Sequence, residues 1–152
     1  MNIINTSDIE QVKNQIKDSK KNPIIVNAQN DNFNRKILEY GKFDILFFSS
    51  NFLKQKKDGL RQIDSGFNHI LGKIASKNKI AIGFDLNDIN QLEKKDKAII
   101  LSKIIQNIKI CRKTKTKIAF INYKDKINLS NLLMSLGAST EQAIDPQPIA
   151  TD

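Results

Sequence analysis

Short, uninterrupted apolar runs recur along the chain and constrain its fold more than any other feature of the sequence. They lie at residues 24–26, 44–48, 80–84 and 117–121. A strand with one face in water alternates apolar and polar residues, whereas a strand that is apolar throughout is buried on both faces. Longer amphipathic segments separate the runs. Buried strands that alternate with such helices predict an α/β fold of parallel βα units with right-handed crossovers.

The amphipathic segments predict the helices that connect these strands. We expect helices over about 7–18, 31–40, 65–77, 88–114 and 128–136. Ser7 and Glu10 match a capping box at the start of the first helix, and Gly41 suits the left-handed residue that ends the second. Residues 49–62 lack a helical period and carry several lysines, which predicts a long basic loop.

The number of strands limits the architecture. About four strands are too few to close an eight-stranded barrel, so a partial barrel and a small open sheet both fit the pattern. No linker divides the chain, and residues 1–143 are predicted to form a single βα domain. Residues 144–152, with Pro146 and Pro148, are predicted to be a flexible C-terminal tail.

The charge balance indicates the class of partner. Lys and Arg number 25 against 16 Asp and Glu, a formal net charge of +9. Such a domain attracts polyanions, of which nucleic acid is the usual one; an anionic membrane surface and a merely solubilising excess of lysine are the alternatives. No apolar run approaches the ~20 residues that span a bilayer, no signal peptide is evident, and the single Cys111 fits a reducing compartment. We therefore expect a cytoplasmic protein that does not contact membranes.

Residues with catalytic chemistry are scarce. The single His69 and Cys111 do not make up the three or four ligands of a zinc site, and no glycine-rich phosphate loop occurs. Asp85 and Asp88 follow the third apolar run, where a carboxylate site for Mg²⁺ is one interpretation. The interpretation we favour is structural: Asp88 caps the next helix and Asp85 ends the strand. The protein is thus expected to bind no metal or cofactor of its own.

Two basic clusters are better candidates for function. The first comprises Lys54, Lys56, Lys57 and Arg61, directly before the predicted 65–77 helix, where backbone N–H groups and cations together could hold a phosphate. The second comprises Lys109, Arg112, Lys113, Lys115 and Lys117, at the end of the long predicted helix; of these, Lys109, Arg112 and Lys113 are the candidate RNA contacts. Complementation of the helix dipole explains only part of it, because that effect fades within about one turn. Few aromatic residues are interleaved, so contact with the backbone of a folded RNA is favoured over base stacking.

Several ordered segments carry a family resemblance. They are Asp64-Ser65-Gly66-Phe67-Asn68-His69 within 58–75, the strand-like 78–86, Gln106-Asn107-Ile108-Lys109-Ile110-Cys111-Arg112-Lys113, and 133–143 with Leu136-Gly137. At this spacing the chain resembles ribonuclease P protein component 3, with Phe67 in place of the family's Leu. Full-length members are longer TIM-like barrels. The resemblance therefore implies a TIM-barrel-like fold that is reduced or open, with a first strand, helix and second strand missing or supplied by another chain.

The resemblance also implies a function. It implies a non-catalytic subunit of the RNA-based endonuclease that removes the 5′ leader from precursor tRNA, in which the RNA and its bound Mg²⁺ carry the chemistry. The implied partners are ribonuclease P RNA, a smaller protein subunit in a heterodimer or heterotetramer, and precursor tRNA indirectly. Asn68 and His69 join the two basic clusters as candidate RNA contacts, although a buried His69 that only holds its loop is an equal alternative. A degenerate phosphoesterase using Asp85 and Asp88, and a pure protein-interaction scaffold, are the competing functions.

Overall fold

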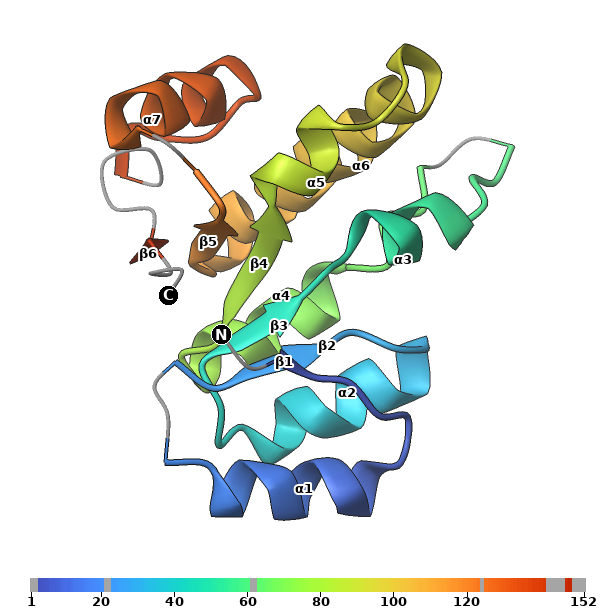
Figure 1. Cartoon of the computed structure of the whole chain (residues 1–152), viewed down its shortest axis with the longest axis vertical. Coiled ribbons are helices and arrows are strands. Elements are labelled where there is room, and N and C mark those ends of the chain that lie inside the picture. Colours follow the sequence, from blue (N-terminus) through green and yellow to red (C-terminus); the bar gives the residue numbers. More distant parts are fainter. Residues whose placement is uncertain (1–2, 21–22, 61–62, 124, 142–146, 149–152) are drawn as a thin grey trace.

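The computed structural model describes residues 3–20, 23–60, 63–123, 125–141 and 147–148 (Figure 1). The strands are β1 (Ile3–Ile4), β2 (Ile25–Asn27), β3 (Ile45–Phe47), β4 (Ala81–Asp85), β5 (Ile118–Ile121) and β6 (Gln147–Pro148). The helices are α1 (Ile9–Asp18), α2 (Asp31–Tyr40), α3 (Ser50–Gln55), α4 (His69–Lys77), α5 (Leu86–Asn90), α6 (Lys94–Thr114) and α7 (Lys126–Ser135).

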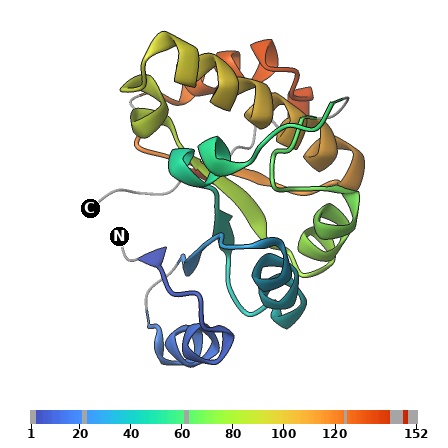
Figure 2. The ribbon, with the colours of Figure 1, turned by 90° about the vertical axis from the view of Figure 1, so that its right-hand side faces the viewer.

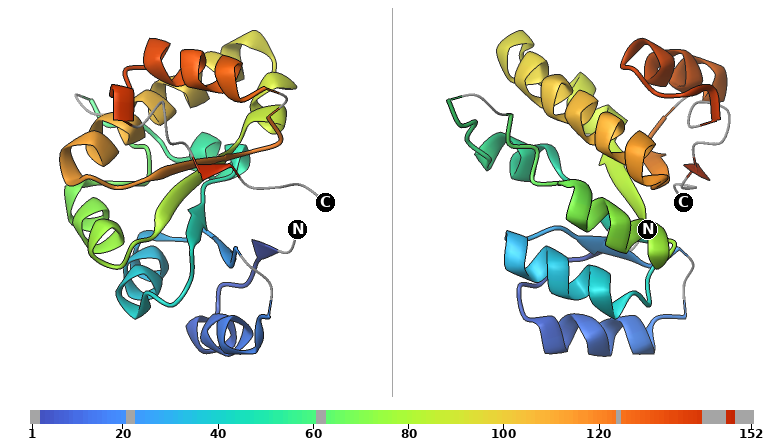
Figure 3. Two further views of the ribbon diagram at one scale, coloured as in Figure 1. Left: turned by 90° about the vertical axis from the view of Figure 1, so that its left-hand side faces the viewer. Right: turned by 180° about the vertical axis from the view of Figure 1, so that it is seen from behind.

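The sheet runs through the described residues as six parallel strands in sequential order, from β1 to β6. Because this order never reverses, right-handed crossovers place the connecting helices on one side. Figure 2 and the left view of Figure 3 show the strands curving inside a ring of helices, and the described edge strands β1 and β6 do not pair with each other. This confirms the prediction of βα units in an open, TIM-barrel-like arrangement. The predicted count of about four strands was too low, because β1 and β6 are only two residues long.

Both faces of the sheet are buried, which explains why its strands are apolar throughout. Val26, Leu46 and Ile82 belong to the large core that also contains the helices' apolar residues. Ile25, Ile45 and Phe47 alternate with them and form, with Ala81, Ala119 and Ile121, a second core on the opposite face. In an open barrel this second face is the interior, where side chains of neighbouring strands pack together.

Capping residues explain why one predicted helix agrees with the structure and why another begins later than predicted. The α2 boundaries agree with the prediction: Asn30 Oδ1 accepts from the Phe33 N–H at 2.8 Å, and Gly41 adopts a φ of 73°. At α1, by contrast, the N-cap is Asp8 and not Ser7. Asp8 Oδ1 accepts from the Glu10 N–H at 2.9 Å, because a carboxylate satisfies the free N–H groups and the positive end of the helix dipole together.

The predicted loop at 49–62 was wrong over its first part, which forms α3. Ser49 caps this helix by accepting from the Phe52 N–H at 3.1 Å, and Leu53 is buried in the core. The predicted 65–77 helix begins later, at His69, because Asn68 Oδ1 caps it by accepting from the Leu71 N–H at 3.0 Å. Local side-chain caps thus decide where these elements begin.

The predicted 88–114 helix is two helices, α5 and α6. Asp85 caps α5 by accepting from the Asp88 N–H at 3.0 Å, so the predicted capping role of Asp88 was wrong. In the predicted tail, residues 147–148 form β6, with Gln147 in register with Ala119; the rest of 144–152 lies outside the described residues. No helix in the described part of the chain is both long and apolar enough to cross a membrane.

Candidate functional site

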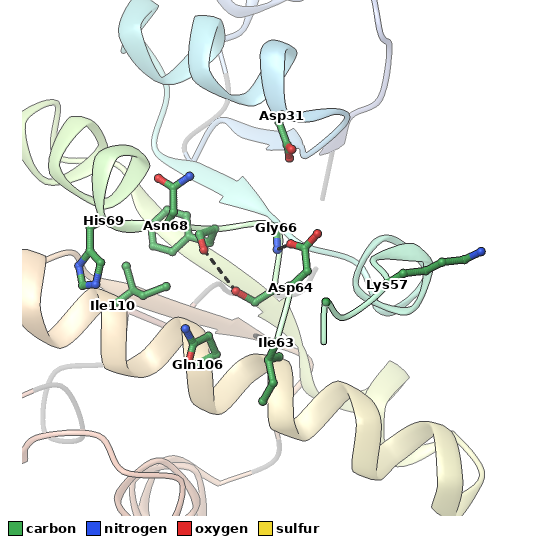
Figure 4. Close-up of a pocket in the computed structure, with 12 residues that line it drawn as sticks. Asp31, Lys57, Ile63, Asp64, Gly66, Asn68, His69, Gln106 and Ile110 are labelled. Carbon is green, nitrogen blue, oxygen red and sulfur yellow. Dashed lines mark hydrogen bonds between the residues drawn. The ribbon is translucent and has the colours of Figure 1, made fainter. Parts of the chain in front are cut away.

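A cavity of about 830 Å³ lies between the loop that precedes α4 and the side of α6 (Figure 4). Asp64, Gly66, Asn68 and His69 line it from the loop and the start of α4, together with Lys57, Gly59, Ile63, Ser65, Phe67, Gln106, Ile110 and Asp31. The segment that carries the family resemblance therefore forms one wall of a cavity. The Gln-Asn-x-x-x-Cys-Arg-Lys segment of α6 contributes to the opposite wall through Gln106 and Ile110.

Hydrogen bonds within the loop hold this wall in place. The Gly66 N–H donates to Asp64 Oδ1 at 2.9 Å, and the Asp64 N–H donates to Asp58 Oδ1 at 2.9 Å. Gly66 has a φ of 73°, and a Cβ there would lie 2.6 Å from Phe52 Cε1, so both conformation and space require glycine. The turn directs Phe67 into the core, where its ring meets Phe48 edge-on with 5.9 Å between centroids.

The turn leaves His69 exposed on the first turn of α4, although Ser65, Gly66 and Phe67 of the preceding loop are buried. The alternative of a buried His69 that only holds the loop was therefore wrong. Asn68 has a structural role, since its side-chain oxygen caps α4. Within this motif His69 is the side chain that remains available to a ligand in the cavity.

Two lysines of the first basic cluster, Lys54 and Lys56, form ion pairs with aspartates. Lys54 Nζ lies 2.9 Å from Asp96 Oδ2, and the hydrogen bond to that carboxylate raises the pKa of Lys54. Lys56 Nζ lies 2.8 Å from Asp31 Oδ1 and 5.4 Å from the centre of the Phe52 ring. Lys57 is exposed and forms no ion pair with a described carboxylate; its side chain extends away from His69 (Figure 4). Arg61, the fourth predicted cation, lies outside the described residues.

Lys103 of α6 holds this basic segment in place and was missed by the sequence reasoning. The residue is only 1% exposed, and Nζ donates to the Leu53 carbonyl at 2.8 Å and to the Lys56 carbonyl. These carbonyls belong to the C-terminal end of α3, so a buried ammonium caps that helix, with Asp58 Oδ1 3.8 Å away. One signal was visible in the sequence, because Lys103 occupies the apolar stripe beside Ile100 and Ile104.

The candidate RNA contacts of the second basic cluster lie exposed along the last turns of α6. Lys109, Arg112 and Lys113 form no ion pair with any carboxylate in the described part of the chain. Lys109 and Lys113 stand three and seven positions after Gln106, which puts them on the same helix face as this cavity-lining residue. The fold thus brings the second cluster next to the cavity that the first cluster also borders.

The two carboxylates weighed as a metal site are bound to protein groups. Asp85 Oδ1 caps α5, and Asp85 Oδ2 accepts from Asn122 Nδ2 at 3.0 Å. Asp88 Oδ2 accepts from the Ser50 hydroxyl. Among the described residues there is no group of three or more His, Cys, Asp or Glu side chains placed to hold a metal ion. The structure therefore uses these aspartates to join α3, α5 and the sheet.

The sequential parallel sheet and the outer helices define an open TIM-barrel-like protein, with an exposed basic cluster next to its cavity. No family model matches the chain. It is similar to ribonuclease P protein component 3 of Methanococcus maripaludis strain C7, with 25% identity over 117 residues, and of strain C6, with 26% identity. Each match covers 76% of this chain and 47% of the relative, so the chain spans about half the length of these curated relatives.

A solved structure shares the fold. A chain of the cryo-EM structure of archaeal ribonuclease P with mature tRNA superposes with a TM-score of 0.74 and 21% identity. The match covers 93% of this chain and 61% of that chain. The resemblance to ribonuclease P protein component 3 that the motifs indicate is thus confirmed at the level of sequence similarity, and the open barrel at the level of fold.

Proposed function

We propose that this chain is a protein subunit of ribonuclease P that binds the catalytic RNA and a smaller protein subunit, and so supports removal of the 5′ leader from precursor tRNA. The observation that carries the proposal is the sequence similarity to component 3 over 76% of the chain. The formal charge of +9 supports it, because an RNA fold needs cations to offset its phosphate repulsion. On this view the RNA and its Mg²⁺ carry the chemistry.

Among the candidate RNA contacts of the two basic clusters, exposed cations without ion pairs to described carboxylates are the proposed phosphate contacts. Lys57, Lys109, Arg112 and Lys113 meet this criterion. Lys54 and Lys56 are secondary candidates, because RNA phosphates must displace Asp96 and Asp31 from them. His69 is proposed to contact the RNA within the cavity, and Asn68 acts through its cap on the helix that carries His69.

Salt titration of RNA binding tests this proposal. Each lost phosphate contact lowers the slope of log affinity against log salt by about 0.7 to 1. We expect Lys109→Ala, Arg112→Ala and Lys113→Ala each to lower the slope for ribonuclease P RNA, measured by fluorescence anisotropy. Lys17→Ala is the matched control, since Lys17 is an exposed lysine in the last turn of α1, outside both basic clusters. Equal slopes for the wild type and all three variants would refute these contacts.

Reconstitution tests the subunit role itself. The chain is mixed with ribonuclease P RNA, the smaller subunit and precursor tRNA at limiting Mg²⁺. We expect the chain to raise the cleavage rate and to co-elute with both partners. Unchanged cleavage together with the absence of RNA binding would reject the proposed function. Cleavage by the chain alone, lost in Asp85→Ala, would instead indicate an enzyme.

A further inference from the structure

A second cavity, of about 560 Å³, lies at the carboxyl ends of β1, β2 and β3. It differs from the first cavity in chemistry, since side-chain amides dominate its wall. They come from Asn5, Asn27, Gln29, Asn30, Asn51 and Gln55. The carboxyl ends of parallel strands are where α/β proteins place their ligands. This position therefore suits a binding site that the proposed phosphate contacts do not use.

The amides at the base of this cavity are held in a fixed arrangement. Asn5 Oδ1 accepts from Asn27 Nδ2 at 3.0 Å and from Gln29 Nε2 at 3.1 Å. The backbone of Gln29 is itself clamped by the fully buried Asn34, whose Oδ1 accepts from the Gln29 N–H at 2.8 Å. The Asn34 side chain also donates to the Gln29 carbonyl at 3.2 Å. Three amides at the carboxyl ends of β1 and β2 are thus preorganised before any ligand binds.

One acceptor in this arrangement is unsatisfied. Asn27 Oδ1 is buried and accepts no hydrogen bond from any residue that the structure describes. A buried acceptor without a donor is costly, and a ligand N–H or O–H group that reached this oxygen after a small rearrangement of the amides would remove that cost. Asn51 and Gln55 of α3 also line the cavity and are exposed, so their side chains can reorient toward a ligand.

The cavity is close to electrically neutral. Lys56 is its one charged lining residue, and its charge is matched by Asp31 at 2.8 Å. The half-buried Phe52 also lines the cavity and adds an apolar surface. A neutral, polar group fits this lining better than a phosphate does. The volume lies within the range of about 300–1,000 Å³ that small ligands occupy.

We propose that this amide cavity binds one unstacked nucleobase of an RNA. An amide presents a donor and an acceptor side by side, which matches the hydrogen-bonding edge of a base. Bases outside helices are read on these edges, and RNA-binding proteins favour them. The inference rests on the proposed function, because that function supplies the RNA. It adds base recognition to the phosphate contacts, at a separate place in the fold.

Side-chain amide resonances test the proposal directly. Protein labelled with ¹⁵N is titrated with adenosine, cytidine, uridine and ribose 5-phosphate, and the Asn and Gln NH₂ signals are followed. We expect at least one nucleoside to shift the Asn5 and Asn27 signals, and ribose 5-phosphate to leave them in place. Shifts with ribose 5-phosphate, or no shift with any nucleoside, would overturn the assignment.

RNA binding by variants separates this inference from the proposed function. We expect Asn27→Ala to weaken binding of a single-stranded RNA about tenfold, with an unchanged salt slope, because a bidentate base contact contributes about that factor. The double variant Asn51→Ala/Gln55→Ala, at exposed positions, covers the case that Asn27→Ala does not fold. Asn14→Ala, on the exposed side of α1, is the matched control.

The possible outcomes are distinguishable. Wild-type affinity in Asn27→Ala and in the double variant would overturn the base site while leaving the proposed function intact. A lowered salt slope in these variants would mark a phosphate contact and also overturn it. If the wild-type protein binds no RNA at all, the proposed function and the base site both fail.

Discussion

Replacing Lys103 by Met tests whether a buried ammonium holds the basic segment in place. The thioether has nearly the length of the lysine stem, so the packing against α3 is kept while the charge is removed. The Leu53 and Lys56 carbonyls then lose their donor. A buried acceptor left without a partner costs about 1–3 kcal/mol. The two acceptors together thus cost about 2–6 kcal/mol, and part of this cost is offset because the variant no longer desolvates an ammonium. We expect a net loss of about 1–3 kcal/mol in the free energy of unfolding.

Urea denaturation gives this number. The midpoint should fall while the m-value stays constant, because the buried area of the folded state is unchanged. Amide exchange should also accelerate in α3, whose Leu53 N–H donates to the Ser49 carbonyl at 3.0 Å. Lys95→Met, at an exposed position of the same helix, is the control and should change stability by less than about 0.5 kcal/mol. A loss in Lys103→Met as small as in this control would refute the reasoning.

Two further predictions concern single residues. Gly66→Ala should lower the free energy of unfolding by about 2 kcal/mol, because it forces a left-handed alanine against the Phe52 ring. Gly137→Ala is the control in the same urea assay: Gly137 also has a positive φ, but a Cβ there would have nothing within 4 Å, so this variant measures the backbone strain without the clash. Burial raises the pKa of the Cys111 thiol to about 12 from 9.0, so its alkylation near pH 8 should be about 1,000-fold slower than in the urea-unfolded chain. As pH rises above about 9, the Cys111 thiol loses its proton in the unfolded chain but keeps it in the folded one, so the free energy of unfolding should fall. Alkylation of the native protein at the unfolded rate would contradict the buried position.

The sequence predicted the sheet well because its physical cause is local. A parallel strand buried on both faces must be apolar at every position, and β2 to β5 carry that pattern without interruption. The two-residue strands β1 and β6 are too short to show any pattern. The six-residue α3 likewise has too few turns to reveal a helical period, and its formation depends on the burial of Leu53.

The site was predictable only in part, for a different reason. The basic clusters were visible as composition, but the pairing of a cation is a tertiary property. Lys54 finds Asp96 across 42 positions, and Lys56 finds Asp31 across 25. The amide cavity gathers residues from three strand ends and gives no signal in any one segment. Which cations remain free, and therefore which can bind phosphate, follows from the fold and not from the local sequence.

The ion pair of Lys56 and Asp31 stands between the two cavities. Lys56 lines the amide cavity and Asp31 lines the cavity that contains His69. An RNA that places a base in one cavity and its backbone along the other must pass this pair. Its phosphate competes with the Asp31 carboxylate for the ammonium, since both are oxyanions. The free energy needed to break this ion pair therefore opposes RNA binding at this point.

Asp31→Asn removes that competition and should strengthen RNA binding. Freeing one cation for a phosphate should steepen the slope of log affinity against log salt by about 0.7 to 1. A general gain in positive charge instead acts on the RNA at longer range and is screened by salt. Asp18→Asn is the matched control, because it removes the same charge from an exposed position at the end of α1. If both variants steepen the slope equally, the gain is due to net charge alone and Lys56 does not contact the RNA. A steeper slope in Asp31→Asn only would place the RNA backbone between the two cavities.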